Sequence, residues 1–598
     1  MPTTTTRRSL PADPHSHAEP NRVRVVHLSL DLALDFERRR AEGSARLDLE
    51  RIDRDAPLRL DVRALEILGV TGSAGGKRKY IVGPEDDATA SELIVELARD
   101  DTSVTVHYRT TERAEAMQWL APAQTAGGKQ PFLFTQGQAI LTRTWIPLQD
   151  SPAVRITYDA TIRAPQGLTP VMSAEQLGRA ADGAWHFRMQ QPIPSYLIAL
   201  ACGELEFSAV SARCGVWAEP SVLGGARSEL EDMEAMVQSA EELFGPYRWG
   251  RYDLIVLPPS FPFGGMENPR LTFATPTILA GDKSLVGLVA HELAHSWSGN
   301  LVTNATWRDF WLNEGFTVYF EQRIMERVYG PERSNMEKVL GLREYEEELP
   351  TLDLGLRMLH LDLVGRNPDD AVTSVPYQKG ALFLRRIEEL VGRPAFDRFL
   401  RRWFDEHAFM SVTTEEFLAY LRSELLAHYP DAATKLNLVE WLYDGGVPAD
   451  LPRPRSAMLD EVDAQVARWT AGTAAEALVT KGWTTQQWLR FLDALPASLS
   501  VVQLAQLDRV FGFTQSRNSE ILCEWLVACV RNQYSAADSR VAEFLCSVGR
   551  RKFLKPLYTE LAKSPEGLRR AREIYALARP RYHAVSTRTI DDLLDWKP

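Results

Sequence analysis

The sequence predicts a multidomain α+β protein, with a β-rich N-terminal part, a mixed middle part and a helical C-terminal part. Apolar and polar residues alternate through the first two hundred residues, and helical spacing takes over near Gly203. A Gly/Pro-rich stretch then precedes a series of amphipathic helices. A chain of 598 residues is long enough for three or four domains. The expected division is a disordered tail (1–20), a β-sheet domain (21–205), a catalytic domain (206–445), a Pro-rich linker (446–455) and an α-helical domain (456–598).

The β-rich part is predicted from period-two patterning. Leucines at 28, 30, 32 and 34 alternate with polar or small residues, which is typical of a half-buried strand. Similar alternation occurs at 46–50, 58–62 and 103–108. The segment before it is rich in Thr, Ser, Pro and His and lacks the apolar core of a signal peptide. We therefore expect His15 and His17 to lie in a solvated tail.

Helices dominate after residue 203. In the middle part the pattern predicts a short strand at 254–257 and four helices, at 228–244, 285–298, 315–329 and 380–391. In the C-terminal part it predicts helices of ordinary globular length, for example at 488–495, 501–511 and 519–530. No fixed-length repeat is visible. The C-terminal part is therefore expected to be an α-helical layer or a short solenoid.

Composition narrows the class of protein. The hydrophobic content of 45% and charged content of 25% are those of a soluble globular chain, and the formal net charge is −12. Without a sustained basic run, neither nucleic acid nor an anionic membrane is an expected partner. The five cysteines show no C-x-x-C spacing, which fits a reducing compartment and excludes a cysteine metal site. No stretch has the length of a membrane span, and we expect a cytoplasmic monomer.

The most informative motif is His-Glu-Leu-Ala-His at 291–295, followed by Asn-Glu-Gly at 313–315. On a helix, His291 and His295 lie one turn apart on the same face, so both can bind one metal ion. A catalytic zinc takes three protein ligands and keeps one position for water, and Glu314 is the candidate third ligand. Glu292 is then placed to take a proton from that water. The alternative is a buried helix with two structural histidines.

Three further motifs are weak on their own. The first, at 263–268, contains Gly264, Gly265, Met266 and Glu267; its glycines let the backbone approach a ligand closely. The second is Gln-Gly-Gln, with Gln136 and Gln138, and the third places Tyr377 just before a helix. Taken alone, the first motif also suits a turn with a solvated glutamate, and the second also suits an ordinary segment of the β region. Tyr377 taken alone also suits a tyrosine that only packs in the core.

Together these motifs resemble the M1 metallopeptidases (gluzincins), in particular the leukotriene A(4) hydrolase and aminopeptidase B branch. The resemblance covers essentially residues 21–598 and is most specific between 254 and 321. The segments that carry it are Gln136–Ile140, Leu257–Pro262, Gly264–Pro269, Leu271–Asn304, Trp311–Gly315, Val375–Tyr377 and Gly549–Phe553.

The resemblance implies a saddle-shaped β domain, a thermolysin-like zinc catalytic domain and an α-helical C-terminal domain. The resemblance also implies that the zinc ligands are His291, His295 and Glu314, that Glu292 is the general base, and that Tyr377 donates a hydrogen bond to the oxyanion. It implies that the substrate's free amine is bound by Glu267 and Gln138, with Gln136, Gly264, Gly265 and Met266 around them. Finally, it implies that Arg550 and Lys552 bind the carboxylate of a short peptide. From helix geometry, Glu321 lies two turns beyond Glu314 and could orient a zinc histidine; a core-edge ion pair is the alternative.

The leading hypothesis is a zinc aminopeptidase that acts on short peptides, with a preference for N-terminal Arg or Lys or with broad specificity. The alternative is an epoxide hydrolase acting on a fatty-acid epoxide of leukotriene type. Asp369 matches the aspartate associated with that reaction, but it would equally suit a basic first side chain. Val372, Phe263 and Phe316 depart from the animal leukotriene hydrolase and weaken the epoxide hypothesis. A third hypothesis, a non-catalytic zinc scaffold, has no need of Glu292, Glu267 and Tyr377 together.

Overall fold

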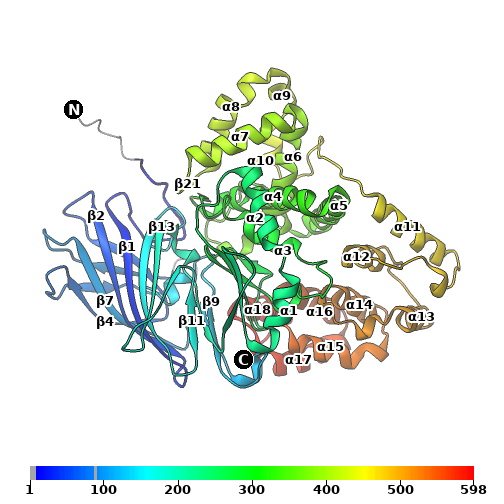
Figure 1. Ribbon diagram of the computed structural model, residues 1–598, viewed down its shortest axis with the longest axis horizontal. Helices are drawn as coiled ribbons and strands as arrows, with labels where there is room; N and C mark the ends of the chain where they lie inside the picture. The colour runs from blue at the N-terminus through cyan, green and yellow to red at the C-terminus, as the bar shows by residue number, and fades with distance from the viewer. Residues whose placement is uncertain (1–7, 87–89, 598) are drawn as a thin grey trace.

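The computed structural model describes residues 8–86 and 90–597, and its three parts follow one another across Figure 1. The β-rich part is at the left, the catalytic part in the centre, and the helical part at the lower right. The predicted fold class is confirmed: a β-rich domain, a catalytic domain and a helical domain. The boundaries between them stay predictions.

The N-terminal part is built on a seven-stranded sheet in the order β12-β13-β10-β1-β2-β7-β4. In β1 (Val23–Asp35), Leu28, Leu30 and Leu32 are at most 2% exposed, as the alternating pattern predicts. β1 pairs antiparallel with β2 and parallel with β10. The other strands of the sheet are β2 (Arg40–Arg51), β4 (Leu65–Gly72), β7 (Ser103–Thr110), β10 (Arg155–Arg163), β12 (Glu175–Arg179) and β13 (Trp185–Pro194).

A second sheet of this part carries the Gln-Gly-Gln motif toward the catalytic part. Its order is β11-β14-β9-β8, and Gln136 directly follows β9 (Phe132–Thr135), all of whose residues are buried. Such a continuously apolar strand is typical of a sheet covered on both faces. The remaining strands are β8 (Met117–Leu120), β11 (Thr169–Met172) and β14 (Leu200–Gly203). The motif is thus fixed by a rigid element.

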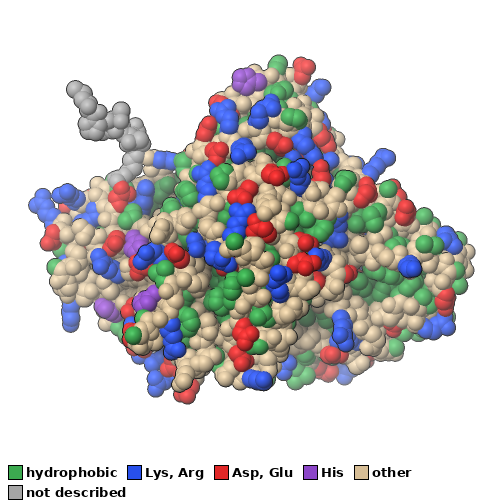
Figure 2. All heavy atoms as spheres, in the orientation of Figure 1, with side chains coloured by type: hydrophobic (Ala, Val, Ile, Leu, Met, Phe, Trp, Pro, Cys, Tyr) green, Lys and Arg blue, Asp and Glu red, His purple; other side chains and the backbone are tan. Residues whose placement is uncertain are grey.

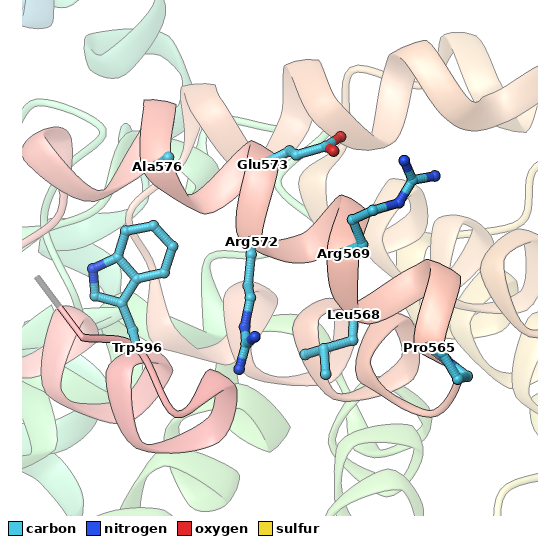
Figure 3. A pocket seen from close by; sticks show the side chains of 7 residues that line it. All are labelled: Pro565, Leu568, Arg569, Arg572, Glu573, Ala576 and Trp596. Carbon is cyan, nitrogen blue, oxygen red and sulfur yellow. The ribbon is translucent and has the colours of Figure 1, made fainter.

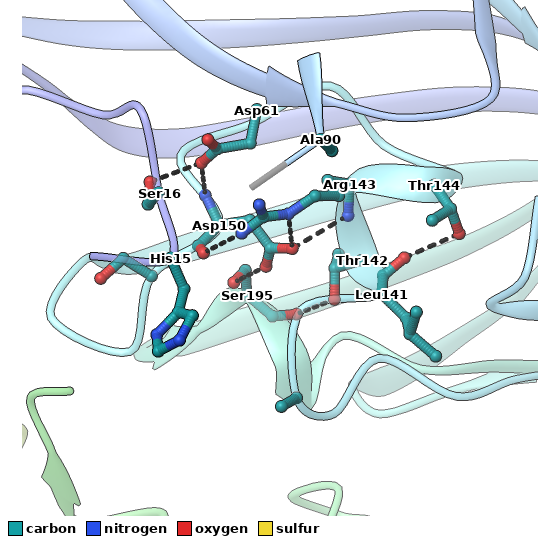
Figure 4. A network of polar contacts seen from close by, with 12 residues as sticks. His15, Ser16, Asp61, Ala90, Leu141, Thr142, Arg143, Thr144, Asp150 and Ser195 are labelled. Carbon is teal, nitrogen blue, oxygen red and sulfur yellow. Dashed lines mark hydrogen bonds and ion pairs between the residues drawn. The ribbon is translucent and has the colours of Figure 1, made fainter. Parts of the chain in front are cut away.

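The segment at 8–20 lies against the protein, and our expectation of a solvated tail is wrong for these residues; residues 1–7 lie outside those described. His15 is 2% exposed, and its Nε2 lies 3.1 Å from Leu363 O and 3.2 Å from Arg366 O. Ser16 Oγ donates to the buried Asp61 at 2.6 Å (Figure 4). Specific polar contacts hold this N-terminal arm, and composition alone does not reveal them.

The catalytic part combines a five-stranded sheet, in the order β15-β16-β17-β19-β18, with helices. The edge strand β18 (Gly265–Met266) pairs antiparallel with β19 (Leu271–Ala274) and so places the Gly-Gly motif at the sheet edge. The inner helices are α3 (Gly287–Ala294) and α4 (Trp311–Tyr329), which pack on each other. The remaining strands are β15 (Glu206–Ala209), β16 (Cys214–Ala218) and β17 (Tyr252–Val256).

The helical part has the layered arrangement expected of a short solenoid. Each helix of one layer contacts the next helix but one along the chain: α12 (Thr485–Asp493) contacts α14 (Ser519–Arg531), α14 contacts α16 (Arg551–Ala562), and α16 contacts α18 (Ala584–Leu594). In the second layer α15 (Asp538–Ser547) packs on α17 (Pro565–Ala578). Figure 2 shows cationic and anionic side chains interspersed on one face of the molecule. Within residues 8–86 and 90–597, no helix is both long and apolar enough to cross a membrane.

Candidate active site

Two packed helices bring the three predicted metal ligands together. His291 and His295 come from the end of α3, and Glu314 comes from the first turn of α4. Glu314 Oε2 lies 3.3 Å from His291 Nε2 and 3.6 Å from His295 Nε2. The three ligand atoms lie within 4.8 Å of one another. Among the described residues, this buried Oε2 has no hydrogen-bond partner, which fits a carboxylate reserved for a metal ion.

The far side of each histidine ring is fixed by a hydrogen bond. His291 Nδ1 lies 3.0 Å from Glu321 Oε2, which is one of the two possibilities that helix geometry left open. His295 Nδ1 lies 3.0 Å from Ser298 O, a carbonyl that can only accept, so this nitrogen carries the proton. The Nε2 atom of each ring then has its lone pair available on the side of Glu314. Such partners orient a metal-binding histidine and select its tautomer.

Glu292 is buried beside these ligands, and among the described residues it forms no ion pair with Lys or Arg. It is 5% exposed, and its Oε2 has no hydrogen-bond partner among the described residues. Burial raises the pKa of its carboxyl well above the usual range; His291 opposes this, while Glu267 and Glu314 add to it. A cation held by the neighbouring ligands would lower the pKa again. A Cβ atom on Gly265 would lie 2.1 Å from Glu292 Oε1, so only glycine leaves room for this carboxylate.

A second buried carboxylate, Glu267, lies next to the same centre. Ligand atoms of Glu267, Glu292 and His295 also fall within 4.8 Å of one another. Asn313 Nδ2 lies 3.5 Å from Glu267 Oε1 and 3.4 Å from the Tyr196 hydroxyl. Burial raises the pKa of Glu267. The sequence reasoning did not anticipate Tyr196, and nothing around it in the sequence distinguishes it from a packed tyrosine.

The Gln-Gly-Gln segment borders this carboxylate. Gln136 Nε2 lies 3.3 Å from Met266 Sδ, so the motif after β9 meets the motif of β18. Within the described part of the chain, Gln136 Oε1 and Gln138 Nε2 are buried without a partner. Buried amide groups of this kind are usually satisfied by a ligand or by water. The two motifs, 130 residues apart, therefore form one wall of the site.

Tyr377 faces the metal ligands from the π-helical turn η9 (Val375–Lys379). Its ring stacks on His291 with centroids 6.1 Å apart and packs edge-on against Phe310. Burial raises the pKa of its hydroxyl well above the usual range, and Glu314 raises it further. The hydroxyl therefore keeps its proton and remains a hydrogen-bond donor at neutral pH.

Arg550 and Lys552 approach from the helical domain and share one carboxylate that the sequence reasoning missed. Glu520 Oε1 lies 3.0 Å from Arg550 Nη1, and its Oε2 lies 2.8 Å from Lys552 Nζ. The Arg550 side chain is 12% exposed and Lys552 is 56% exposed. A Cβ on Gly264 would lie 2.7 Å from Arg550 Nη2, so the guanidinium reaches the Gly-Gly motif. The pair carries one net positive charge after Glu520 is counted.

Asp369 lies next to the Gln-Gly-Gln segment, in η8 (Pro368–Ala371). Its Oδ1 accepts a hydrogen bond from Ala139 N at 3.2 Å, directly after Gln138. Its Oδ2 lies 3.6 Å from Nη1 of Arg588, a residue of α18 that the sequence reasoning did not consider. Asp369 is therefore already paired within the chain.

A surface groove away from the metal ligands is lined by none of the candidate site residues. It lies on the helical domain, between α17 and Trp596, which follows α18 (Figure 3). Arg572 on its wall donates to Leu594 O at 2.7 Å, which ties α17 to the end of α18. The other residues that line it are Pro565, Leu568, Arg569, Glu573 and Ala576.

The fold and the site define a zinc hydrolase: two histidines and a glutamate from adjacent helices, with a buried glutamate beside them. Three family models match successive parts of the chain: the peptidase M1 N-terminal domain at 23–197, the peptidase family M1 domain at 229–440 and the leukotriene A4 hydrolase C-terminal domain at 483–594. The chain belongs to peptidase family M1.

Individual relatives agree over nearly the whole length. The chain is 35% identical to aminopeptidase B of Rattus norvegicus, covering 95% of this chain and 94% of the relative. It is 37% identical to leukotriene A-4 hydrolase of Xenopus laevis, covering 92% and 94%. A solved structure of yeast LTA4 hydrolase with bestatin superposes with a TM-score of 0.91 at 30% identity, covering 98% of both chains.

Proposed function

We propose that the chain is a zinc-dependent aminopeptidase in which His291, His295 and Glu314 hold the ion. The observation that carries the proposal is the position of Glu267, whose carboxylate lies within 4.8 Å of ligand atoms of Glu292 and His295. A buried carboxylate there pairs with the free α-ammonium group of a peptide. Cleavage is then confined to the first peptide bond, because the amine is held one residue from the reacting carbonyl.

The remaining side chains suit amide hydrolysis. When bound, zinc lowers the pKa of a coordinated water to about 7 and polarises the scissile carbonyl. Glu292 accepts a proton from the attacking water and returns it to the leaving amine. Tyr377 donates a hydrogen bond to the oxygen on which negative charge develops. The free edge of β18 offers backbone groups that can pair with the substrate chain.

Arg550 and Lys552 limit the length of the substrate in this proposal. Both cations pair with Glu520 and also interact with Glu344, and Arg550 reaches Gly264 of the motif that also carries Glu267. A cation at this place pairs with the C-terminal carboxylate of a short peptide. Fixing both ends of the substrate favours tripeptides and other short peptides over long chains.

The N-terminal residue preference is open to a direct test. Asp369 led us to expect Arg or Lys, or broad specificity, but its contact with Arg588 speaks against an unpaired acid. The experiment is a panel of aminoacyl-coumarin substrates, together with a fatty-acid epoxide, assayed before and after treatment with a zinc chelator. We expect amide hydrolysis that is lost on chelation and restored by zinc. Turnover of the epoxide alone, or amide hydrolysis insensitive to the chelator, would contradict the proposal.

A further inference from the structure

Asp369 and Arg588 meet where all three parts of the molecule join. Asp369 belongs to the catalytic part and accepts its hydrogen bond from Ala139 of the β-rich part. Arg588, from α18 of the helical part, contacts Asp369 through Nη1 and donates through Nη2 to Glu115 at 3.0 Å. One guanidinium therefore bridges two carboxylates, one from each of the other two parts.

The start of α18 is held firmly by packing, which fixes the backbone of Arg588 close to Asp369. His583 caps the helix by accepting from Val585 N at 3.2 Å, and its ring stacks on Phe134 of β9 with centroids 6.0 Å apart. Ser586 Oγ donates to Gly549 O at 2.9 Å. His583 and Ser586 are both fully buried. The helix thus carries Arg588 to Asp369 as part of a packed interface.

The surroundings of Asp369 contain cations of the chain as well as further acids. Its side chain is 14% exposed, and Asp370 is the adjacent acid. Arg551 donates to Val372 O at 3.4 Å, three residues further along the same segment. Burial raises the pKa of Asp369 above its ordinary value, and Arg588 and Arg551 oppose that rise; both cations also act on Asp370. An added ammonium or guanidinium group would meet these cations and would have to displace Arg588.

We propose that Arg588 is a specificity-determining residue, which occupies Asp369 and disfavours peptides whose first residue is Arg or Lys. The preferred first residue is then uncharged, although an acid lies beside Gln138. This inference rests on the proposed aminopeptidase function. Asp369 alone would suggest a preference for N-terminal Arg or Lys. The inference reverses this preference, because the substrate meets the combined charge of Asp369 and Arg588.

The test compares arginyl- and alanyl-coumarin substrates in wild type and Arg588→Gln. The variant should raise the ratio of kcat/KM values for arginyl over alanyl substrate roughly tenfold, mainly through KM, since a charge-assisted hydrogen bond becomes available to the substrate. Arg588→Lys should leave the ratio near wild type. Glu115→Gln is the matched control, because it removes the other partner of Arg588 and leaves Asp369 paired. Adding Asp369→Asn to Arg588→Gln should abolish the gain.

An unchanged ratio in Arg588→Gln would overturn the proposal, and so would a gain that persists in the double variant. A wild-type enzyme that already prefers the arginyl substrate tenfold would also overturn it. Calorimetric binding of free L-arginine and L-alanine provides a readout that needs no turnover. If the wild type cleaves no aminoacyl substrate, the proposed function fails. In that case, L-arginine binding that is tighter in Arg588→Gln than in the wild type would still support the role of Arg588. Equal L-arginine binding by the two proteins would refute that role.

Discussion

At the scale of single residues, the site contains several buried polar atoms without a hydrogen-bond partner among the described residues, as do other places in the fold. Glu314 Oε2, Glu292 Oε2 and Gln138 Nε2 are three such atoms among the described residues. Leaving buried polar groups unpaired typically costs about 1–3 kcal/mol each, so they are uncommon unless a ligand satisfies them. The site is therefore organised for a metal ion and a polar substrate before either binds.

Tyr377 tests whether the site is built for the transition state. Tyr377→Phe should lower kcat by roughly a hundredfold to a thousandfold with little change in KM, because the hydroxyl hydrogen bond forms mainly as negative charge develops. Steady-state kinetics on an alanyl substrate measure both constants, and bound zinc should remain stoichiometric. A raised KM with an intact kcat would instead make Tyr377 a ground-state binding residue.

Local motifs were predictable from sequence, and long-range partners were not. His291 and His295 share a helix face because of their spacing, and the Glu321 contact followed from two further helical turns. Glu520 and Arg588 pair with residues distant in the chain, and an isolated Glu or Arg carries no signal of such a partner. The roles of the site residues are predictions that the geometry supports.

At the scale of elements, the type and approximate length of the helices were predicted better than the residues at which they begin and end. The helix at 501–511 begins and ends as predicted, whereas the helix expected at 285–298 is the shorter α3. Its N-cap is Val286, which offers no side-chain cap, and Asp282 upstream accepts a bond from Ser284 N. The helix expected at 228–244 is interrupted at 230–232, where α1 (Pro220–Glu229) gives way to α2 (Met233–Phe244). Glu229 there binds the backbone of Gly281 and Lys283.

The N-terminal arm should stabilise the segment that leads to Asp369. His15 donates to backbone carbonyls of 363 and 366, only a few residues before η8. His15→Ala should lower the free energy of unfolding by about 1–2 kcal/mol, since it leaves buried carbonyls unpaired. Thermal unfolding measures this, and His17→Ala is the matched control because, among the described residues, its ring makes one long hydrogen bond, at 3.5 Å. Equal effects of the two variants would show that the arm contributes little through His15.

The start of α16 should set the substrate length. Arg550→Ala should reduce kcat/KM for tripeptides by at least roughly tenfold while sparing aminoacyl-amides, which lack the C-terminal carboxylate. Lys555→Ala is the control, because Lys555 is exposed on the same helix. Kinetics on both substrate classes distinguish the alternatives. Equal losses on both, or none on either, would remove the carboxylate contact from the account, as expected of ordinary surface charges.

At the scale of the whole molecule, each of the three parts contributes residues to the proposed active site. In the proposed site, the β-rich part provides Gln136 and Gln138, the catalytic part provides the candidate metal ligands and Glu267, and the helical part provides Arg550 and Arg588. Their burial and ion pairs fix these positions across domain junctions. The order of the domains was predictable from sequence patterning. The contacts between the domains were not, because packing between distant segments leaves no periodic pattern in the sequence.

The most direct test of the account separates metal binding from proton transfer. Glu292 touches the centre but is not one of the three proposed ligands, so Glu292→Gln should retain one zinc per chain and lose nearly all hydrolysis of an alanyl substrate. Elemental analysis of the purified variant and a parallel rate assay give both quantities. Full zinc with turnover reduced by at least a hundredfold is the predicted result. A variant that keeps near wild-type turnover, or one that loses its zinc, would contradict the account.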